Sequence, residues 1–444
     1  MFRKLLIANR GAIAARIAHS CRTLGIATVQ PACALDEGAP FIDAADQVIP
    51  MTDPPPNPYL DAAGLIALAQ RERCDALHPG YGFLSEDSRF AAAVAEAGMT
   101  FIGPTAEQIE RFGDKANARA ALARAGLPVF VGSGALESLA AAERWLADQP
   151  LPVLLKPVAG GGGIGMQVVR DRADLPAAFE RAQALAGAAF GDPRLLLEQF
   201  VEAGRHIELQ LLASNSGTVM HAWERDCSVQ RRRQKVIEEA PAPGLERGEI
   251  AALADSAVAA VAELGYSNIG TLEFLRGTDG RYGVLEVNTR IQVEHAVTEA
   301  ITGLDLVAQQ LTLAAGAELP QSVTPAGHAI EARLYAEDPA TGFPATGTLT
   351  RLDWPRLHGL RVERGAAAGQ RIGPHFDPLL GKLISCAPTR DRAIGQLRVA
   401  LKTLVVEGVA TNQRQLLAIV ESDDFAAGEW HTQRLEPQPR TALL

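Results

Sequence analysis

The chain has 444 residues, of which 47% are apolar and 21% are charged, a balance typical of a globular protein with two or three domains. Its net charge of −10 argues against nucleic acid as a partner, because a nucleic-acid-binding surface is basic. No apolar run approaches membrane-spanning length, no secretion signal opens the chain and its five cysteines lack C-x-x-C spacing, so we expect a cytoplasmic protein with reduced thiols.

The first hundred residues alternate between strand and helix. Residues 4–9 form an apolar run typical of a short strand, 11–25 have helical spacing, and 26–30 read as a second strand. A further helix is expected over 61–72. This order predicts a doubly wound α/β domain over residues 1–112.

A glycine run follows a lysine in KPVAGGGGIGM, residues 156–166. Apolar, β-branched segments flank it at 153–156 and 166–169, so a hairpin fits better than a linker. The run also matches G-x-G-x-x-G from Gly160 onward, but a dinucleotide fingerprint should open a helix, and here a strand follows. Two interpretations remain: an ordinary loop, or a lid whose backbone N–H groups close over phosphates.

The rest of the chain divides into a helical connection over 113–129, a small domain over 130–203 and a larger domain over 204–444. The small domain contains the glycine hairpin, a helix near 173–187 and a strand near 195–200. In the larger domain we expect strands at HIELQLL, TVMHAWE, GTLEFL, YGVLEVN and AIEARLYAE, and late helices near 390–403 and 411–420.

The segments GTLEFLR and RYGVLEVN flank the turn GTDG and predict a hairpin over 270–288. If Arg276 pairs with Arg281, then Glu273 lies opposite Val284. Glu273 on the first strand then lies on the same face of the sheet as Glu286 and Asn288 near the end of the second strand.

That face carries Glu273, Glu286 and Asn288. Cross-strand diagonals lie roughly 7–8 Å apart, close enough for these side chains to converge. Two carboxylates repel unless solvent or a cation lies between them, and a Glu/Glu/Asn set suits Mg²⁺ completed by phosphate. An exposed, charged sheet face is the alternative.

Basic residues cluster once, in ERDCSVQRRRQK over 224–235. In an acidic chain such a cluster favours a small anion over a nucleic acid backbone.

Six motifs resemble those of biotin carboxylase, an ATP-grasp enzyme, in the family's order and spacing. They are IANRG (7–11), HPGYGFLSE (78–86), GDK (113–115), ERDCSVQRR (224–232), QKVIEEAPAP (234–243) and EVNTRIQVEH (286–295). The resemblance runs from residue 1 to about 435. It implies an N-terminal α/β domain, a small glycine-lid domain and a larger mixed α+β C-terminal domain, with ATP between the last two. The glycine run is then the lid over the phosphates.

The resemblance also assigns residues to MgATP. The residues that resemble nucleotide contacts are Lys115, Lys156, Gly161, Gly162, Gly163, Glu198, Val201, His206, Gln230 and Arg233. Glu273, Glu286 and Asn288 resemble the family's ligands for Mg²⁺, which Mn²⁺ can replace, and the hairpin argument reaches the same three residues.

Bicarbonate is the second substrate that the family implies, and biotin is the third. The residues that resemble the bicarbonate site are Lys235, Arg290, Gln292 and the backbone at Val293. By resemblance Glu294 takes the bicarbonate proton, carboxyphosphate forms and breaks to CO₂ and phosphate, and phosphate deprotonates biotin, which attacks CO₂. Arg333 stabilises the developing oxygen anion of biotin, and Tyr81, Glu86 and Arg16 resemble the rest of the biotin site.

Several positions depart from the family pattern. Arg233 stands where the family commonly has histidine or asparagine, Ala12 interrupts the usual NRGEIA, and Ile164 replaces a common basic residue. Residues 30–41 also diverge, around the N-terminal loop and the expected homodimer surface.

The chain contains no biotin attachment site of the family type, because no methionine precedes a lysine. We therefore expect biotin on a carboxyl carrier protein and a separate carboxyltransferase, either as other chains or as further parts of the parent chain. Two other functions remain open: another ATP-grasp ligase with an acyl-phosphate intermediate, such as a carbamoyl-phosphate synthase-like activity, or a degenerate nucleotide-binding partner.

Overall fold

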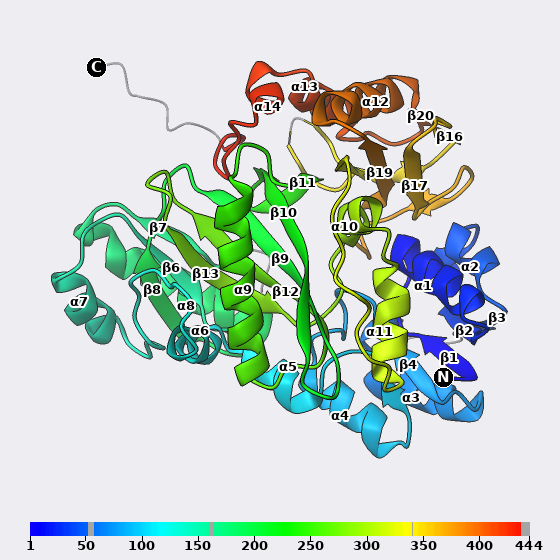
Figure 1. The fold of residues 1–444 in the computed structure, drawn as a ribbon, viewed down its shortest axis with the longest axis horizontal. Helices are drawn as coiled ribbons and strands as arrows, with labels where there is room; N and C mark the ends of the chain where they lie inside the picture. Colours follow the sequence, from blue (N-terminus) through cyan, green and yellow to red (C-terminus); the bar gives the residue numbers. More distant parts are fainter. Residues whose placement is uncertain (52–56, 160–163, 340, 437–444) are drawn as a thin grey trace.

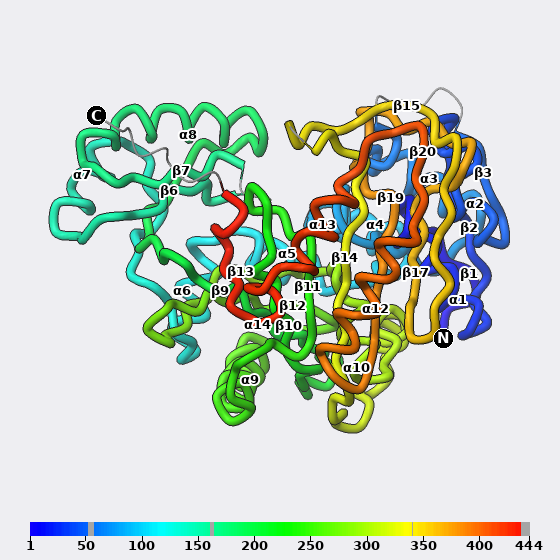
Figure 2. The backbone as a smooth tube through the Cα atoms, turned by 90° about the horizontal axis from the view of Figure 1, so that it is seen from above, coloured from blue at the N-terminus to red at the C-terminus, as the bar shows by residue number. Residues whose placement is uncertain are grey.

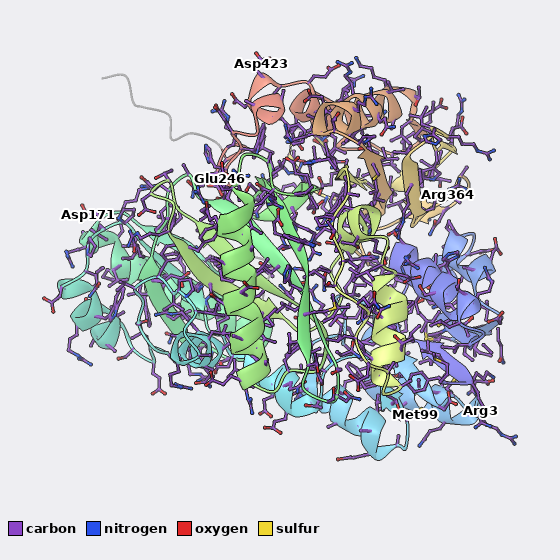
Figure 3. The ribbon with its side chains drawn as sticks, viewed as in Figure 1. Arg3, Met99, Asp171, Glu246, Arg364 and Asp423 are labelled. Carbon is purple, nitrogen blue, oxygen red and sulfur yellow. The ribbon has the colours of Figure 1, made fainter. Side chains whose placement is uncertain are left out.

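The computed structural model describes residues 1–51, 57–159, 164–339 and 341–436 (Figure 1). Within these ranges, three sheets of three or more strands carry the architecture, with five, three and eight strands. The three-stranded sheet lies at one end of the molecule and the five-stranded sheet at the other (Figure 1). Asp171 and Arg3 mark these two ends in Figure 3. No helix in the described ranges is long and apolar enough to cross a membrane.

The five-stranded sheet is parallel and belongs to the first 101 residues. Its strands lie in the order β3 (Gln47–Pro50), β2 (Ala27–Ala32), β1 (Lys4–Ile7), β4 (Ala76–His78) and β5 (Thr100–Phe101), with helices α1 (Gly11–Thr23), α2 (Pro40–Ala44), α3 (Ala62–Arg71), α4 (Ser88–Glu96) and α5 (Ala106–Gly113). Successive side chains of a strand point to opposite faces, so Leu5 and Ile7 pack against α1 while Leu6 packs against α3 and α4. Burial on both faces confirms the doubly wound α/β prediction.

The three-stranded sheet, here called the lid sheet, contains the glycine hairpin. Its strands lie in the order β7 (Gln167–Val169), β6 (Val153–Pro157) and β8 (Leu195–Gln199), and the neighbouring helices are α7 (Leu139–Ala147) and α8 (Leu175–Phe190). Helix α6 (Lys115–Arg124), which precedes them, packs against the eight-stranded sheet. Val153 pairs antiparallel with Val169, which confirms the predicted hairpin. The predicted phosphate contacts Gly161, Gly162 and Gly163 lie outside the described residues.

The eight-stranded sheet is antiparallel throughout. Its strands lie in the order β13 (Tyr282–Asn288), β12 (Asn268–Arg276), β9 (Arg205–Ala213), β10 (Val219–Arg231), β11 (Gln234–Ala240), β14 (His328–Tyr335), β19 (Leu379–Ala387) and β17 (Leu360–Arg364), and its helices are α9 (Arg247–Glu263), α10 (His295–Thr302) and α11 (Leu306–Ala314). Helix α9 crosses the sheet in Figure 1 and packs Ala254 and Ala257 against Leu209 and Leu211 of β9.

The C-terminal part adds small elements around the far edge of this sheet. They are β15 (Gly347–Thr348), β16 (Arg351–Asp353), β18 (Arg371–Ile372), β20 (Val405–Glu407), α12 (Arg390–Thr403), α13 (Gln413–Val420) and α14 (Asp423–Ala427). Helices α12 and α13 confirm the two late helices that were predicted. Beyond α14 the chain returns toward β9, where the Thr432 N–H donates to the Gly204 carbonyl at 3.0 Å (Figure 2).

The register of the hairpin between β12 and β13 differs from the prediction. Arg276 pairs with Tyr282, one residue beyond the predicted partner, and a bulge after Glu273 shifts the ladder by one more residue. Glu273 therefore lies directly opposite Glu286, so the predicted pairing with Val284 is wrong.

The turn explains part of this shift. The Gly277 N–H donates to the Arg281 carbonyl at 2.8 Å, and the Asp279 carboxylate accepts from the Arg281 N–H at 3.1 Å, so Arg281 belongs to the turn rather than to the strand. Opposite residues of an antiparallel pair point to the same side, so the two glutamates still share one face of the sheet.

Candidate active site

A cavity of about 690 Å³ opens between the lid sheet, the eight-stranded sheet and the loops that follow β1 and β4. Most of the predicted site residues line it. They are Tyr81, Lys115, Lys156, Glu198, Val201, His206, Gln230, Arg233, Lys235, Glu273, Glu286, Asn288, Arg290, Gln292, Val293, Glu294 and Arg333. Of the predicted residues that the structure describes, Glu86 and Arg16 are not part of the lining.

Lys235 is the central cation of the charged wall. Its Nζ donates to Glu208 at 2.6 Å, to Glu273 at 3.0 Å and to Glu294 at 2.6 Å. Burial alone would lower the pKa of Lys235, but the three carboxylates outweigh it and raise the pKa well above its usual value. The ammonium is therefore permanently charged at physiological pH, as a binding site for a small anion requires.

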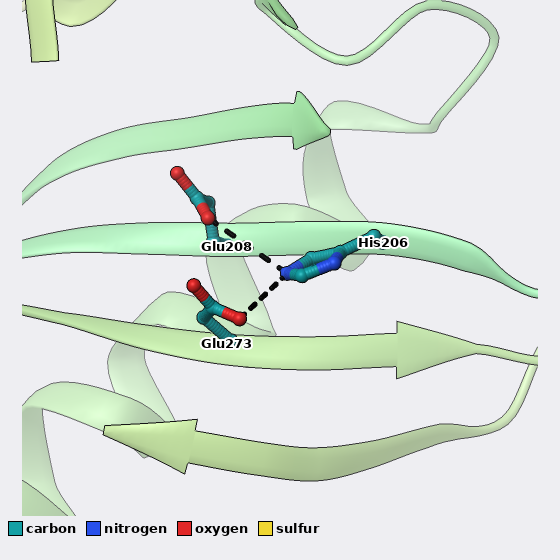
Figure 4. A group of neighbouring side chains, drawn as sticks. All are labelled: His206, Glu208 and Glu273. Carbon is teal, nitrogen blue, oxygen red and sulfur yellow. Dashed lines mark ion pairs between the residues drawn. The ribbon is translucent and has the colours of Figure 1, made fainter. Parts of the chain in front are cut away.

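Glu273 contacts several of the other side chains that line the cavity. Besides Lys235, it accepts hydrogen bonds from Asn288 Nδ2 at 2.8 Å and Gln292 Nε2 at 2.7 Å. His206 Nε2 lies 2.9 Å from it and 3.8 Å from Glu208 (Figure 4). Burial would raise the pKa of Glu273, but the neighbouring cation and imidazole hold it far below its usual range, so the carboxylate is ionised.

The oxygen donors fit a bound Mg²⁺. Glu273 and Glu286 lie directly opposite each other on neighbouring strands, Asn288 contacts Glu273, and all three line the cavity. Glu286 also lies 3.6 Å from Lys115 Nζ. A second group, His206, Glu208 and Glu273, has ligand atoms within 4.8 Å of one another, but a histidine suits zinc better than Mg²⁺. The Glu/Glu/Asn set is therefore the better match for Mg²⁺.

Glu294 lies between two cations just before helix α10. One carboxylate oxygen accepts from Lys235 at 2.6 Å and the other from Arg333 Nη2 at 2.8 Å. Burial would raise the pKa of Glu294, but these two cations and Arg225 lower it well below the usual value. The arrangement holds an ionised carboxylate beside two groups that also attract an anionic substrate.

Arg225 is a functional residue that the motif analysis did not single out. Its guanidinium is completely buried and donates to Glu208 at 2.5 Å and to Gln292 at 2.6 Å. Its other three hydrogen bonds reach Gln210, Thr271 and Thr298. The residues of the basic cluster 224–235 therefore have different roles. Arg225 holds neighbouring side chains in place, whereas Arg233 and Lys235 line the cavity.

The lid sheet forms a different wall. Lys156 Nζ lies 2.6 Å from Glu198, and Arg119 lies 3.8 Å from the same carboxylate. Apolar side chains supply much of the remaining surface, among them Leu154, Met166 and Val168. This wall suits the flat, uncharged part of a nucleotide, with the Lys156 cation nearby.

The C-terminal segment closes the same end of the cavity, which the sequence did not indicate. Gln433 Oε1 accepts from the Ala203 N–H at 2.9 Å, and its Nε2 donates to the Val201 carbonyl at 3.1 Å. Thr432, Gln433 and Glu436 all line the cavity. No motif marks them, and Thr432 and Gln433 bind the backbone of the loop between β8 and β9, which is far away in the chain.

The predicted biotin residues do not all meet. Tyr81 lines the cavity, whereas Glu86 is not part of the lining and accepts from Arg290 Nε at 3.0 Å. Arg16 is held elsewhere, 2.9 Å from Glu299 and 2.7 Å from Asp305. In the described structure Arg16 therefore joins helix α1 to the region of α10 rather than facing the cavity.

Arg233 does line the cavity, next to Gln230 and Lys235. The alternative interpretation is that Arg233 turns outward and pairs with Glu238 or Glu239. In the described structure Glu238 instead pairs with Arg333, and Glu239 with His328 and Arg390. Burial lowers the pKa of Arg233, and Glu436 acts in the opposite direction.

Three family models match the chain in succession: the biotin carboxylase N-terminal domain over residues 1–109, the ATP-binding domain of the carbamoyl-phosphate synthase L chain over 114–322, and the biotin carboxylase C-terminal domain over 331–437. A biotin carboxylase of Halalkalibacterium halodurans is 45% identical over 434 residues, which cover 97% of this chain and 96% of that protein. The chain belongs to the biotin carboxylase family. Both flanking models are specific to that family, so a carbamoyl-phosphate synthase-like activity is not supported.

Solved biotin carboxylase structures share the fold. The biotin carboxylase domain dimer of 2-oxoglutarate carboxylase from Hydrogenobacter thermophilus, in complex with MgADP, ADP and bicarbonate, superposes with a TM-score of 0.96 at 42% identity, covering 98% of this chain and 97% of that one. Pyruvate carboxylase of Rhizobium etli superposes with a TM-score of 0.94 at 37% identity, covering 99% of this chain and 40% of that one. The protein is thus an ATP-dependent ligase with the ATP-grasp fold, which carboxylates biotin with bicarbonate.

Proposed function

We propose that the cavity holds MgATP, bicarbonate and biotin together, and that different lining residues bind each of them. The observation that carries the proposal is the position of Glu294 between Lys235 and Arg333, inside the cavity that also receives the lid lysine Lys156. A base, two anion-binding cations and a nucleotide-sized space then lie within one site.

Lys115 and Lys156 would contact the phosphates of ATP, while the apolar lid wall and the loop at Val201 that follows β8 would hold the base. Glu273, Glu286 and Asn288 would hold Mg²⁺, which when bound neutralises charge on the phosphate oxygens. Glu198 would act indirectly, by keeping Lys156 extended at 2.6 Å.

Bicarbonate would bind between Lys235, Arg290 and Gln292. Two side chains already hold Gln292, since Arg225 donates to its Oε1 and its Nε2 donates to Glu273. The Val293 carbonyl accepts from Lys382, which orients the peptide next to the site. Groups held in this way need little reorganisation when the anion arrives.

Glu294 would remove the bicarbonate proton as the bicarbonate oxygen attacks the γ-phosphate and ADP leaves. An ion-paired carboxylate with a low pKa is a weak base, and this is the state without substrate. Bicarbonate competes for Lys235, so its binding weakens that ion pair and raises the pKa of Glu294 toward the range a base needs.

Carboxyphosphate then breaks to CO₂ and phosphate, phosphate takes the proton from the biotin ureido nitrogen, and that nitrogen attacks CO₂. Arg333 would stabilise the negative charge on the ureido oxygen, because its guanidinium faces the cavity beside Glu294. Tyr81 would pack beside biotin, and Glu86 would act by orienting Arg290.

We also propose a homodimer that works with a biotin carboxyl carrier and a carboxyltransferase in the cytoplasm, where its five free thiols would stay reduced. The division at residues 112, 129 and 203 is supported by the sheets, because each of the three main sheets lies within one proposed domain.

The test is phosphate release from MgATP, measured with and without bicarbonate and free biotin. We expect release to require bicarbonate and to rise with biotin. Hydrolysis that ignores both would contradict the proposal and favour a degenerate nucleotide-binding protein.

A further inference from the structure

Two buried carboxylates that the proposed reaction does not use lie next to Arg333. Glu238 on β11 and Glu331 on β14 are both 0% exposed, and they stand directly opposite each other in the antiparallel ladder. Opposite residues of such a pair point to the same face, with Cβ atoms roughly 4.5–5.5 Å apart. Two ionised carboxylates at that spacing repel each other in a place that water does not reach.

The hydrogen bonding of this pair is incomplete. None of the four carboxylate oxygens receives a well-aligned hydrogen bond from the described residues. Glu238 has an ion pair with Arg333, and Glu331 has one with Lys382 at 3.3 Å. Ionised carboxylates in a protein interior need several donors, and neither has them.

Both of these cations are shared. Arg333 also binds Glu294 at 2.8 Å, and Lys382 also binds Glu363 at 2.8 Å. Each of those two carboxylates has a further cation of its own, Lys235 for the first and Arg361 for the second. The opposed pair is therefore the part of the network with the least positive charge.

We propose that Glu238 and Glu331 share one proton, and that the singly charged pair holds Arg333 in the position from which it meets biotin. A protonated carboxyl gains an O–H donor, so one member can hydrogen-bond to the other and the pair carries one negative charge instead of two. The shared proton rests on packing alone, whereas its link to catalysis rests on the proposed role of Arg333.

The surroundings favour the protonated form. The charged and titratable groups that face the pair are Arg333 and Tyr335 on β14, Lys235 on β11, Cys227 on β10, Lys382 on β19, Glu363 on β17, Glu294 before α10, and Tyr81. Burial raises the pKa of Glu238 to about 7 and that of Glu331 to about 8, against the opposing effect of the cations. A pKa raised in the folded state means that stability is lost as the pH rises through that value.

The first test measures the thermal unfolding midpoint of the whole chain at pH 6 and pH 9. Glu331→Gln cannot ionise, so we expect its midpoint to lie about 1–3 °C above wild type at pH 9 and to exceed wild type by less at pH 6. A lower midpoint at both pH values would show that Glu331 is an ordinary ionised partner of Lys382 and would overturn the proposal.

Glu239→Gln is the matched control. Glu239 is the next residue on β11, it is also buried, and its carboxylate accepts from His328 at 2.7 Å and from Arg390 at 2.9 Å. Burial would raise the pKa of Glu239, but these partners lower it. Its replacement should therefore lower the midpoint at both pH values, unlike Glu331→Gln.

Infrared difference spectra between pH 6 and pH 9 test the proton directly. Wild type should lose a protonated-carboxyl C=O band on going to pH 9, and Glu331→Gln should not show that change. Identical difference spectra for the two proteins would overturn the shared proton. Neither measurement uses catalytic activity, so both remain valid if the proposed function fails.

The link to Arg333 is tested by the pH dependence of bicarbonate-dependent phosphate release with free biotin. A second negative charge in the pair would draw Arg333 away from the cavity, so wild-type turnover should fall between pH 7 and pH 8. In Glu331→Gln this alkaline limb should move up by about one pH unit or more, with the KM for ATP unchanged. An unmoved limb would show that the pair does not position Arg333.

Discussion

The two walls of the cavity are built on different principles. The wall from the eight-stranded sheet is dense in charge, with Lys235, Glu273 and Glu294 linked by hydrogen bonds of 2.6–3.0 Å. The lid wall is mostly apolar apart from Lys156 and Glu198. The first therefore suits anions and proton transfer, and the second suits the base and phosphates of a nucleotide.

The difference also concerns how firmly side chains are held. On the sheet wall Gln292 has two side-chain partners and Arg225 has five, so the charged groups are oriented before any substrate arrives. On the lid wall Lys156 has one ion pair within the described residues, with Glu198. We therefore expect changes on the sheet wall to affect chemistry and changes on the lid wall to affect nucleotide binding.

The largest expected effect is on the sheet wall. Glu294→Gln removes a base and keeps its shape, so bicarbonate-dependent turnover should fall by about 10²–10⁴-fold while ATP affinity stays nearly the same. Steady-state phosphate release and ATP binding measured on the same preparation check this. If Glu294→Gln instead weakened ATP binding and left turnover unchanged, the assignment of chemistry to the sheet wall and of nucleotide binding to the lid wall would be wrong.

On the lid wall, Lys156→Met should weaken MgATP binding by about 10–100-fold, the size of a lost charge-assisted hydrogen bond of ~1.5–3 kcal/mol. Turnover at saturating ATP should change much less. The control is Lys402→Met: Lys402 has an equally short ion pair, 2.6 Å to Glu421, but it is 53% exposed and far from the cavity. Equal losses in both variants would mean that Lys156 only stabilises the fold.

Glu286 lies at the boundary between the two walls, 3.6 Å from Lys115 Nζ. Glu286→Gln should raise the Mg²⁺ concentration for half-maximal activity by about tenfold, because one anionic donor becomes neutral. Titration of activity with Mg²⁺ at fixed ATP measures it, with the exposed Glu407→Gln as the control. An unchanged Mg²⁺ requirement would remove Glu286 from the metal site.

The smallest effect is expected at Arg233. Arg233→His should weaken ADP binding by about two- to fivefold, with equal or faster turnover, because a permanent cation facing the nucleotide is lost and ADP leaves sooner. Arg232→His is the control, since Arg232 occupies the same turn but is not among the described residues lining the cavity. If both variants behaved alike, Arg233 would have no specific role.

Much of this architecture follows from the sequence. The apolar run of residues 4–9 already predicts a strand, and the segments beside the glycine run already predict the β6–β7 hairpin, because the local pattern of apolar residues reports secondary structure. The motifs and the resemblance also named most of the residues that line the cavity. The alternation of side chains along a strand was enough to place Glu273, Glu286 and Asn288 on one face of the sheet.

The tertiary structure decided what depends on distant parts of the chain. A bulge in β12 places Glu273 opposite Glu286. Arg16 pairs with Glu299 instead of lining the cavity, and Gln433 donates to the Val201 carbonyl. Similarly, Glu238 faces Glu331 only because β11 pairs with β14. Local pattern fixes which side of a strand a residue faces, but which residues meet there is set by pairings between strands far apart in sequence, where packing and the need to satisfy buried charge select one arrangement.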